Sequence, residues 1–265
     1  MNAHDEILVQ HNGPIATVVF NRPKIRNAIS LNMWGEIARV TNDLGREPSV
    51  RAVVYRGSGM EAFASGADIS EFKEVRKDPE TALRYNAQTF AACEAIRGCA
   101  KPTVAMIFGY CMGGGMTMTM AIACDLRFAA EGAKFGIPAA RLGIIYGANA
   151  VSQLVSLVGP AYSKDILFSA RTISDVEALQ IGLIQRLLPP DQLESYTYEY
   201  LGKVAANAPL SVRGAKFTVA SCLEGLTAER RRRLQGMAEE ATGSEDYREG
   251  TQAFLEKRPP KFKGW

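Results

Sequence analysis

Cys111-Met112-Gly113-Gly114-Gly115-Met116-Thr117 joins a β-rich segment, residues 102–109, to an uncharged segment, residues 116–124, that is typical of a helix. Three glycines at a strand-to-helix junction let the backbone approach a ligand closely and leave N–H groups free to bind it. The positive end of the helix dipole would attract a carbonyl oxygen that acquires negative charge. A tight turn with no binding role is the alternative that this glycine cluster leaves open on its own.

A second loop of small residues, Phe63-Ala64-Ser65-Gly66-Ala67-Asp68-Ile69, follows the strand-like segment Arg51-Ala52-Val53-Val54-Tyr55-Arg56. Because residues 64–67 are all small, a backbone N–H can face a ligand here with no side chain in the way. Two such N–H groups, one from each loop, would hold a single oxygen between them. That arrangement stabilises an enolate or a tetrahedral oxyanion.

No charged residue lies between Lys101 and Asp125, a run long enough to cross a bilayer. Gly109 and Gly113 also have the spacing found in membrane helix dimers. Pro102 and the glycine cluster break the run, however, and no basic flank orients it. We therefore expect a buried strand, turn and helix rather than a membrane span.

These loops and several shorter motifs resemble the enoyl-CoA hydratase/isomerase family, also called the crotonase superfamily. The resemblance extends from about Val18 to about Lys263, with the family's motifs in order and at matching spacing. The matching pieces are Asn21-Arg22-Pro23 with Asn27-Ala28, Gly66-Ala67-Asp68-Ile69, residues 109–115, Ala123-Cys124-Asp125-Leu126-Arg127, Phe135-Gly136 with Pro138, Leu142-Gly143, Ala178 with Gly182-Leu183-Ile184, and Phe254-Leu255-Glu256-Lys257-Arg258.

Strands that alternate with helices predict an α/β protein with parallel, buried strands. Strand-like segments are residues 15–20, 50–55, 103–108, 125–130 and 134–136, and helical spacing covers residues 31–44 and 80–97, with Ser30 and Asp78 as caps and Pro79 in the first turn. Beyond Pro189-Pro190 the pattern is helical only, at residues 191–206, 209–221, 227–241 and 246–257.

The resemblance implies a crotonase-like (ClpP/crotonase) fold in two parts. Residues 1–190 would form a spiral of repeated ββα units that holds an acyl-CoA site. Residues 191–265 would form a C-terminal helical region that assembles a homotrimer or, by pairing of trimers, a homohexamer. The last helix would complete the coenzyme A site of a neighbouring subunit.

The resemblance also implies the site residues. The thioester oxygen would accept hydrogen bonds from the N–H groups of Ala67 and Gly114, while Asp68 would brace its loop rather than react. The remaining substrate-binding positions that it implies are Ser65, Gly66, Ile69, Gly113, Thr117, Ala139, Arg26 and Lys257. Lys257 would contact a coenzyme A phosphate from a neighbouring subunit, whereas for Arg26 a merely solvated side chain is the alternative.

Two glutamates that add or remove water in family hydratases are absent here. The first position is Thr117, or Thr119 when counted back from Asp125, and the second is Ala139. Neither residue type can act as a general base near neutral pH, and proton transfer is typically worth ~10²–10⁴-fold. Hydration by the paired-glutamate route is therefore expected to be weak or absent, while chemistry that needs only enolate stabilisation stays open.

Tyr146 is the candidate replacement. Family decarboxylases that act on methylmalonyl-type thioesters can carry a tyrosine at the matching place, and loss of CO2 generates an enolate without a base. Those decarboxylases can also have a histidine where this chain has Ala67, and an aromatic residue that only packs beside Gly147 is the alternative.

Composition excludes several other classes. The 265 residues suffice for a large α/β domain, and a formal charge of +3 suits an anionic small molecule such as coenzyme A. The two histidines argue against a zinc cage or a Ser-His-Asp triad. The five cysteines lack paired spacing and indicate reduced, mostly buried thiols in a cytoplasmic protein, and residues 1–6 lack the pattern of a signal peptide.

Three function classes remain. The leading hypothesis is an enzyme of fatty-acid or related acid catabolism that acts on an acyl-CoA thioester, with no metal and no cofactor beyond the coenzyme A of the substrate. The second is a catalytically silent acyl-CoA-binding protein. RNA binding is only faintly indicated, because the arginine run 230–233 is more typical of a solvated or interface helix face.

Overall fold

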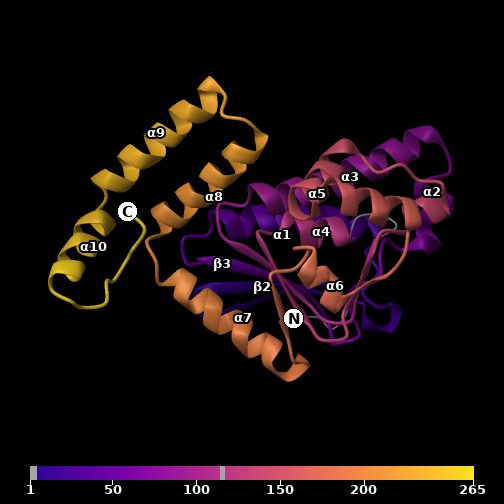
Figure 1. Ribbon diagram of the computed structural model, residues 1–265, viewed down its shortest axis with the longest axis horizontal. Helices are drawn as coiled ribbons and strands as arrows, with labels where there is room; N and C mark the ends of the chain where they lie inside the picture. Colours follow the sequence, from indigo (N-terminus) through magenta and orange to yellow (C-terminus); the bar gives the residue numbers. More distant parts are fainter. Residues whose placement is uncertain (1–4, 114–116) are drawn as a thin grey trace.

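The structure is a computed structural model that describes residues 5–113 and 117–265, without the side chains of residues 117–119. Figure 1 shows helices packed over a twisted sheet, with α8, α9 and α10 extending away from it as an arm. The helices are α1 (Leu31–Arg46), α2 (Phe72–Val75), α3 (Pro79–Gly98), α4 (Thr117–Ala123), α5 (Ala148–Ser169), α6 (Asp175–Gln180), α7 (Pro190–Ala205), α8 (Pro209–Glu224), α9 (Ala228–Gly243) and α10 (Glu245–Leu255), with 3₁₀ turns η1 (Pro23–Ile25), η2 (Ile69–Glu71) and η3 (Pro138–Leu142).

The larger sheet has its strands in the order β1-β2-β3-β5-β7-β10. They are β1 (Ile7–Asn12), β2 (Ile15–Phe20), β3 (Ala52–Gly57), β5 (Thr103–Ile107), β7 (Leu126–Ala130) and β10 (Arg186–Leu188). Pairing is parallel from β2 onward, as the alternating pattern predicts, whereas β1 and β2 are antiparallel. The cause is the two-residue connection at Gly13-Pro14, which is too short for a parallel crossover.

A smaller sheet stacks beside it in the order β4-β6-β8-β9. Its strands are β4 (Ala62–Ala64), β6 (Tyr110–Met112), β8 (Lys134–Gly136) and β9 (Ile173–Ser174), and the first three are parallel. The chain therefore contributes one strand to each sheet and then a helix, three times over: β3-β4-α3, β5-β6-α4 and β7-β8-α5. This repetition is the ββα spiral that the resemblance implies.

Both faces of the inner strands β2, β3, β5 and β7 are buried, which is why these strands are mostly apolar. In β3, Val53 and Tyr55 pack toward α1, α3 and α4, while Ala52 and Val54 face α7. The two-part division at residue 190 stays a prediction, but α7 beyond it packs on the sheet through buried Leu193 and Leu201. The arm of Figure 1 begins with α8.

The expected helix starts are confirmed. The Ser30 hydroxyl accepts a 3.2 Å hydrogen bond from the Met33 N–H, and the Asp78 carboxylate accepts one of 2.8 Å from the Thr81 N–H with Pro79 at the first helical position. The uncharged run is also resolved as expected, because its described part forms β5, β6 and α4. Over residues 5–113 and 117–265, no helix is long and apolar enough to cross a membrane.

Candidate active site

The carboxyl ends of β4, β6 and β8 lie next to one another at one edge of the smaller sheet. Ala64 pairs with Cys111, and Met112 pairs with Gly136, so the residues that follow each strand emerge side by side. Those residues are the loop 65–68, Gly113 and the segment 137–139. Parallel strand ends in an α/β protein are the usual place for a ligand.

One N–H group of the loop 65–68 faces away from Ile29, the residue with which the loop pairs. Gly66 accepts a 2.9 Å hydrogen bond from the Ile29 N–H, and the Asp68 N–H donates one of 2.9 Å to the Ile29 carbonyl. Because successive N–H groups of extended chain point to opposite sides, the N–H of Ala67 faces away from Ile29. It has no hydrogen-bond partner among the described residues, although Ala67 is only 8% exposed.

Asp68 uses both carboxylate oxygens within the protein. Oδ1 accepts hydrogen bonds from the N–H and hydroxyl of Ser70 at 3.0 and 2.6 Å, and Oδ2 pairs with Arg22 at 2.8 Å. Burial raises the pKa of Asp68, but the hydrogen bonds from Ser70 and Arg22 outweigh it, so the net pKa is lowered. A carboxylate so engaged is suited to holding its loop, and Arg22 is a partner that the sequence motif alone does not reveal.

A strained turn sets the other side of the loop. Arg26 and Asn27 both have positive φ, 52° and 54°, an uncommon backbone for residues other than glycine. The buried Asn27 amide donates to the carbonyls of Ser58 and Ala62 at 3.0 and 2.8 Å, and the Arg26 carbonyl then accepts from the Ser65 N–H at 2.9 Å. The Arg26 side chain itself is exposed, pairs with Glu61 and lies over the Tyr110 ring.

Gly113 is held from both sides. Its N–H donates a 2.9 Å hydrogen bond to the Gly136 carbonyl, and its own carbonyl accepts one of 2.5 Å from the Tyr146 hydroxyl. Tyr146 packs against the main core just before α5 begins. The structure thus brings together two predicted residues, Gly113 and Tyr146, that are far apart in the chain.

The remaining predicted residues divide into three groups. Ala139 lies buried in η3, 3% exposed, and Ile69 begins η2 with its side chain 71% exposed. Thr117 is the first residue of α4, its side chain undescribed, and Gly114 lies outside the described residues. Lys257 is exposed two residues after the end of α10, and Figure 1 shows α10 on the opposite side of the molecule from α2, the helix that follows the loop 65–68 and η2.

Arg127 holds the C-terminal end of α4, the helix that follows the glycine cluster. It is 3% exposed, and its guanidinium donates to the carbonyls of Ala121 and Cys124 at 3.2 and 2.7 Å, near the C-terminus of α4. Burial lowers the pKa of Arg127 to about 10, so the group stays cationic at neutral pH and opposes the negative end of the helix dipole. The sequence motif includes this arginine without indicating that it is buried.

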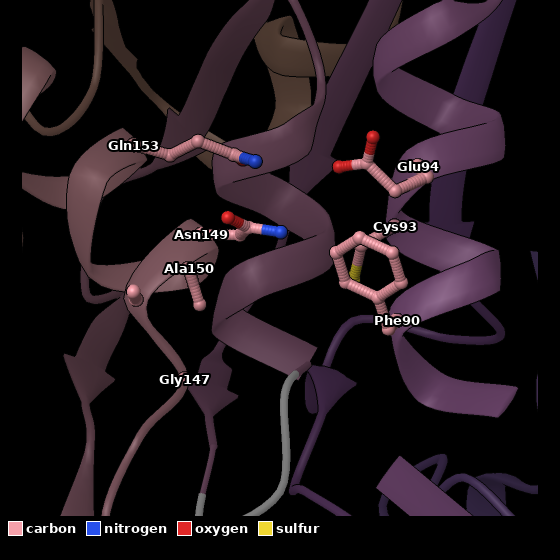
Figure 2. Close-up of a pocket in the computed structure, with 8 residues that line it drawn as sticks. Phe90, Cys93, Glu94, Gly147, Asn149, Ala150 and Gln153 are labelled. Atoms are coloured by element: carbon pink, nitrogen blue, oxygen red, sulfur yellow. The ribbon is translucent and has the colours of Figure 1, made fainter. Parts of the chain in front are cut away.

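A cavity of about 290 Å³ lies between α3 and the first turns of α5 (Figure 2). Phe90, Cys93 and Glu94 line it from α3, and Asn149 and Gln153 line it from α5. Gly147, the residue after Tyr146, also borders it. No group of His, Cys, Asp and Glu residues suited to a metal ion occurs in the part of the chain that the structure describes.

The comparisons with known proteins agree on one family. The model of the enoyl-CoA hydratase/isomerase family matches residues 10–265. A short-chain-enoyl-CoA hydratase from Clostridium acetobutylicum is 32% identical, with 96% of each chain covered, and a crotonyl-CoA hydratase from Syntrophomonas wolfei is 31% identical, with 98% of each covered. The crystal structure of an enoyl-CoA hydratase from Bacillus anthracis superposes with a TM-score of 0.91 at 30% identity, covering 98% of this chain and 100% of that one.

The fold and these loops define an α/β-spiral enzyme of the crotonase superfamily. Within it, the chain belongs to the enoyl-CoA hydratase/isomerase family.

Proposed function

We propose that this enzyme binds an acyl-CoA thioester and stabilises its enolate with two main-chain N–H groups, those of Ala67 and Gly114. The observation that carries the proposal is that the Ala67 N–H has no partner among the described residues, while its neighbours Gly66 and Asp68 are fixed by Ile29. Preorganised donors of this kind are worth ~10²–10³-fold in kcat each. The substrate would come from fatty-acid or related acid catabolism. The enzyme would need no cofactor beyond the coenzyme A that the substrate carries.

Hydration of the enoyl-CoA by a glutamate pair is not the reaction that we propose, although relatives are named as hydratases. The positions expected to hold the glutamates carry Thr117 and Ala139, and the Ala139 methyl group is buried. Neither side chain can activate water as a general base. An enolate formed without base catalysis fits these residues better.

Decarboxylation of a methylmalonyl-type thioester is the second candidate, and the position of Tyr146 on the Gly113 carbonyl favours it. In that step the carbon–carbon bond to the carboxylate breaks, CO2 leaves, and the bonding electron pair moves onto the thioester oxygen as an enolate. A solvent proton then adds to the α-carbon. No side-chain base takes part, so the absence of both glutamates is tolerated.

A panel of crotonyl-CoA, a 3-enoyl-CoA and methylmalonyl-CoA tests the proposal, with coenzyme A binding measured in parallel by calorimetry. Turnover of one of these substrates supports the enzyme and identifies its reaction. Tight coenzyme A binding with no turnover would instead indicate the silent acyl-CoA-binding protein. Absence of binding to coenzyme A and to every thioester would refute the proposal.

Assembly belongs to the same proposal. We expect a homotrimer or homohexamer in which Lys257 of one subunit reaches the coenzyme A of another, because α10, which precedes Lys257, lies in the arm on the opposite side of Figure 1 from α2. The expected place of action is the cytoplasm, and neither a membrane nor RNA is expected as a partner.

A further inference from the structure

The cavity between α3 and α5 has an apolar part and a polar end. In Figure 2, Gly147 lies at the lower end of the cavity, Phe90, Cys93, Asn149 and Ala150 flank its middle, and Glu94 and Gln153 lie at the upper end. Burial raises the pKa of Cys93 to about 12, so this thiol is neutral and acts as an apolar wall. A ligand that enters beside Gly147 would meet mostly apolar groups and the Asn149 carboxamide before it reaches the polar upper end.

Two carboxamides that line the cavity carry hydrogen-bonding capacity that the protein does not use. The carboxamides of Asn149 and Gln153 point toward the cavity (Figure 2), and neither makes a side-chain hydrogen bond to another described residue. Gln153 Oε1 is inaccessible to solvent and has no partner there. A ligand in the cavity cannot reach that oxygen, but the amide nitrogen of Gln153 faces the cavity (Figure 2) and, together with the Asn149 carboxamide, can pair with a polar ligand group.

The charged residues at the upper end of the cavity limit which polar group a ligand can carry there. Glu94 faces the cavity and is paired with Arg97, which binds both of its oxygens at 3.1 and 2.6 Å. Because Arg97 compensates its charge, this carboxylate holds a cation only weakly, and it offers no donor to a terminal carboxylate on a ligand. A hydroxyl group is neutral and both donates and accepts, so it can pair with either end of a carboxamide.

We infer that the cavity is the subsite for the distal part of the acyl group and that it selects an acyl chain ending in a hydroxyl group. The cavity borders Gly147, which follows Tyr146, the residue that binds Gly113. It therefore lies beside the proposed thioester site, and the inference rests on that proposed function. At about 290 Å³ the cavity is at the small end of ligand sites, so the acyl group is short.

Matched acyl-CoA pairs that differ only in a terminal hydroxyl test the inference. We would measure Kd by calorimetry for butyryl- and 4-hydroxybutyryl-CoA, hexanoyl- and 6-hydroxyhexanoyl-CoA, and octanoyl- and 8-hydroxyoctanoyl-CoA. One pair should show about tenfold tighter binding of the hydroxylated member, the effect of roughly one added hydrogen bond. The corresponding chain with a terminal carboxylate should bind no more tightly than the unsubstituted one.

The Gln153→Met variant replaces the carboxamide by an apolar group of similar length and should reduce that preference to less than about twofold. Ser152→Ala, on the same helix but outside the cavity, is the control and should keep it. Acyl-CoA binding with no hydroxyl preference in any pair, or a preference that survives Gln153→Met, would overturn the inference and leave the proposed function standing. Failure to bind any acyl-CoA would refute both.

Discussion

The Tyr146 hydroxyl donates a 2.5 Å hydrogen bond to the carbonyl oxygen of Gly113. That carbonyl belongs to the same planar peptide group as the N–H of residue 114, so a bond that fixes one end restrains the other. Hydrogen bonding to the carbonyl also polarises the N–H of the group. Tyr146 is therefore suited to position the proposed oxyanion donor rather than to transfer a proton to the substrate.

We predict that Tyr146→Phe lowers kcat about tenfold with little change in KM, because the proposed donor at residue 114 would then be held less firmly where negative charge develops in the transition state. A conjugated dienoyl-CoA, whose ultraviolet absorption moves to longer wavelength when its carbonyl is polarised, should show a smaller shift on binding to the variant. Tyr162→Phe, at an exposed position of α5, is the matched control. An unchanged kcat and an unchanged spectral shift would rule out the positioning role.

Gly66 tests the loop that carries the Ala67 N–H. Its φ of 125° is strained for any residue with a side chain, so Gly66→Ala should displace the loop and lower kcat/KM by tenfold or more. Gly59→Ala introduces similar strain, at φ 75°, in open space outside the site, and should leave kcat/KM nearly unchanged. An equal loss of kcat/KM in both variants would show that the position of the loop at residue 66 does not matter for the reaction.

Asp68 predicts a pH dependence of stability. Because its folded pKa is lowered below the ordinary 3.8, the carboxylate stabilises the protein fully above that value and the stabilisation is lost as the pH falls through the folded pKa. Asp68→Asn should cost about 2 kcal/mol of unfolding free energy at pH 7 and progressively less below pH ~4. Urea titrations from below pH ~4 up to pH 7 measure the free energy of unfolding. Asp43→Asn is the control, because Asp43 belongs to an exposed ion pair, and it should change the stability by less than ~0.5 kcal/mol.

Arg127 is expected to be a large contributor to stability. Replacing it by Met leaves the carbonyls of Ala121, Cys124 and Leu183 without their donor and should cost about 3 kcal/mol. Amide hydrogen exchange in residues 120–124 should accelerate at the same time. Arg186→Met, at an exposed position, provides the reference. A loss of stability no greater than that of Arg186→Met would contradict the proposed support of α4.

Lys257 tests the shared coenzyme A site. Lys257→Ala should raise KM for the thioester about fivefold without changing kcat, since a phosphate contact remote from the reaction acts on ground and transition states equally. Lys261→Ala, four residues further along the same tail, should have no such effect. Light scattering on both variants checks that the expected trimer or hexamer persists. An unchanged KM for Lys257→Ala would exclude the lysine from the site.

Local patterns were sufficient for the regular elements. Residues 15–20 form β2 as predicted, and the caps Ser30 and Asp78 begin α1 and α3, because apolar period and capping act over a few residues. The sequence pattern does not predict α5, since Gly159-Pro160 lies in its middle and Gly159 has a φ of 74° at a kink. The strands β4, β6 and β9 are too short for a period to be recognised.

The small residues of two loops predict where the backbone can approach a ligand, because a small side chain acts at the residue that carries it. The mutual position of Ala67, Gly113 and Tyr146 was not readable along the chain, since it follows from the parallel register of β4, β6 and β8. From the sequence alone, charged residues such as Arg22 and Arg127 would be expected to lie in solvent. Only the tertiary packing buries Arg127 and places Arg22 against Asp68. The hydrogen bonds and ion pairs of these side chains are stronger away from water, so they hold the loops of the site in place.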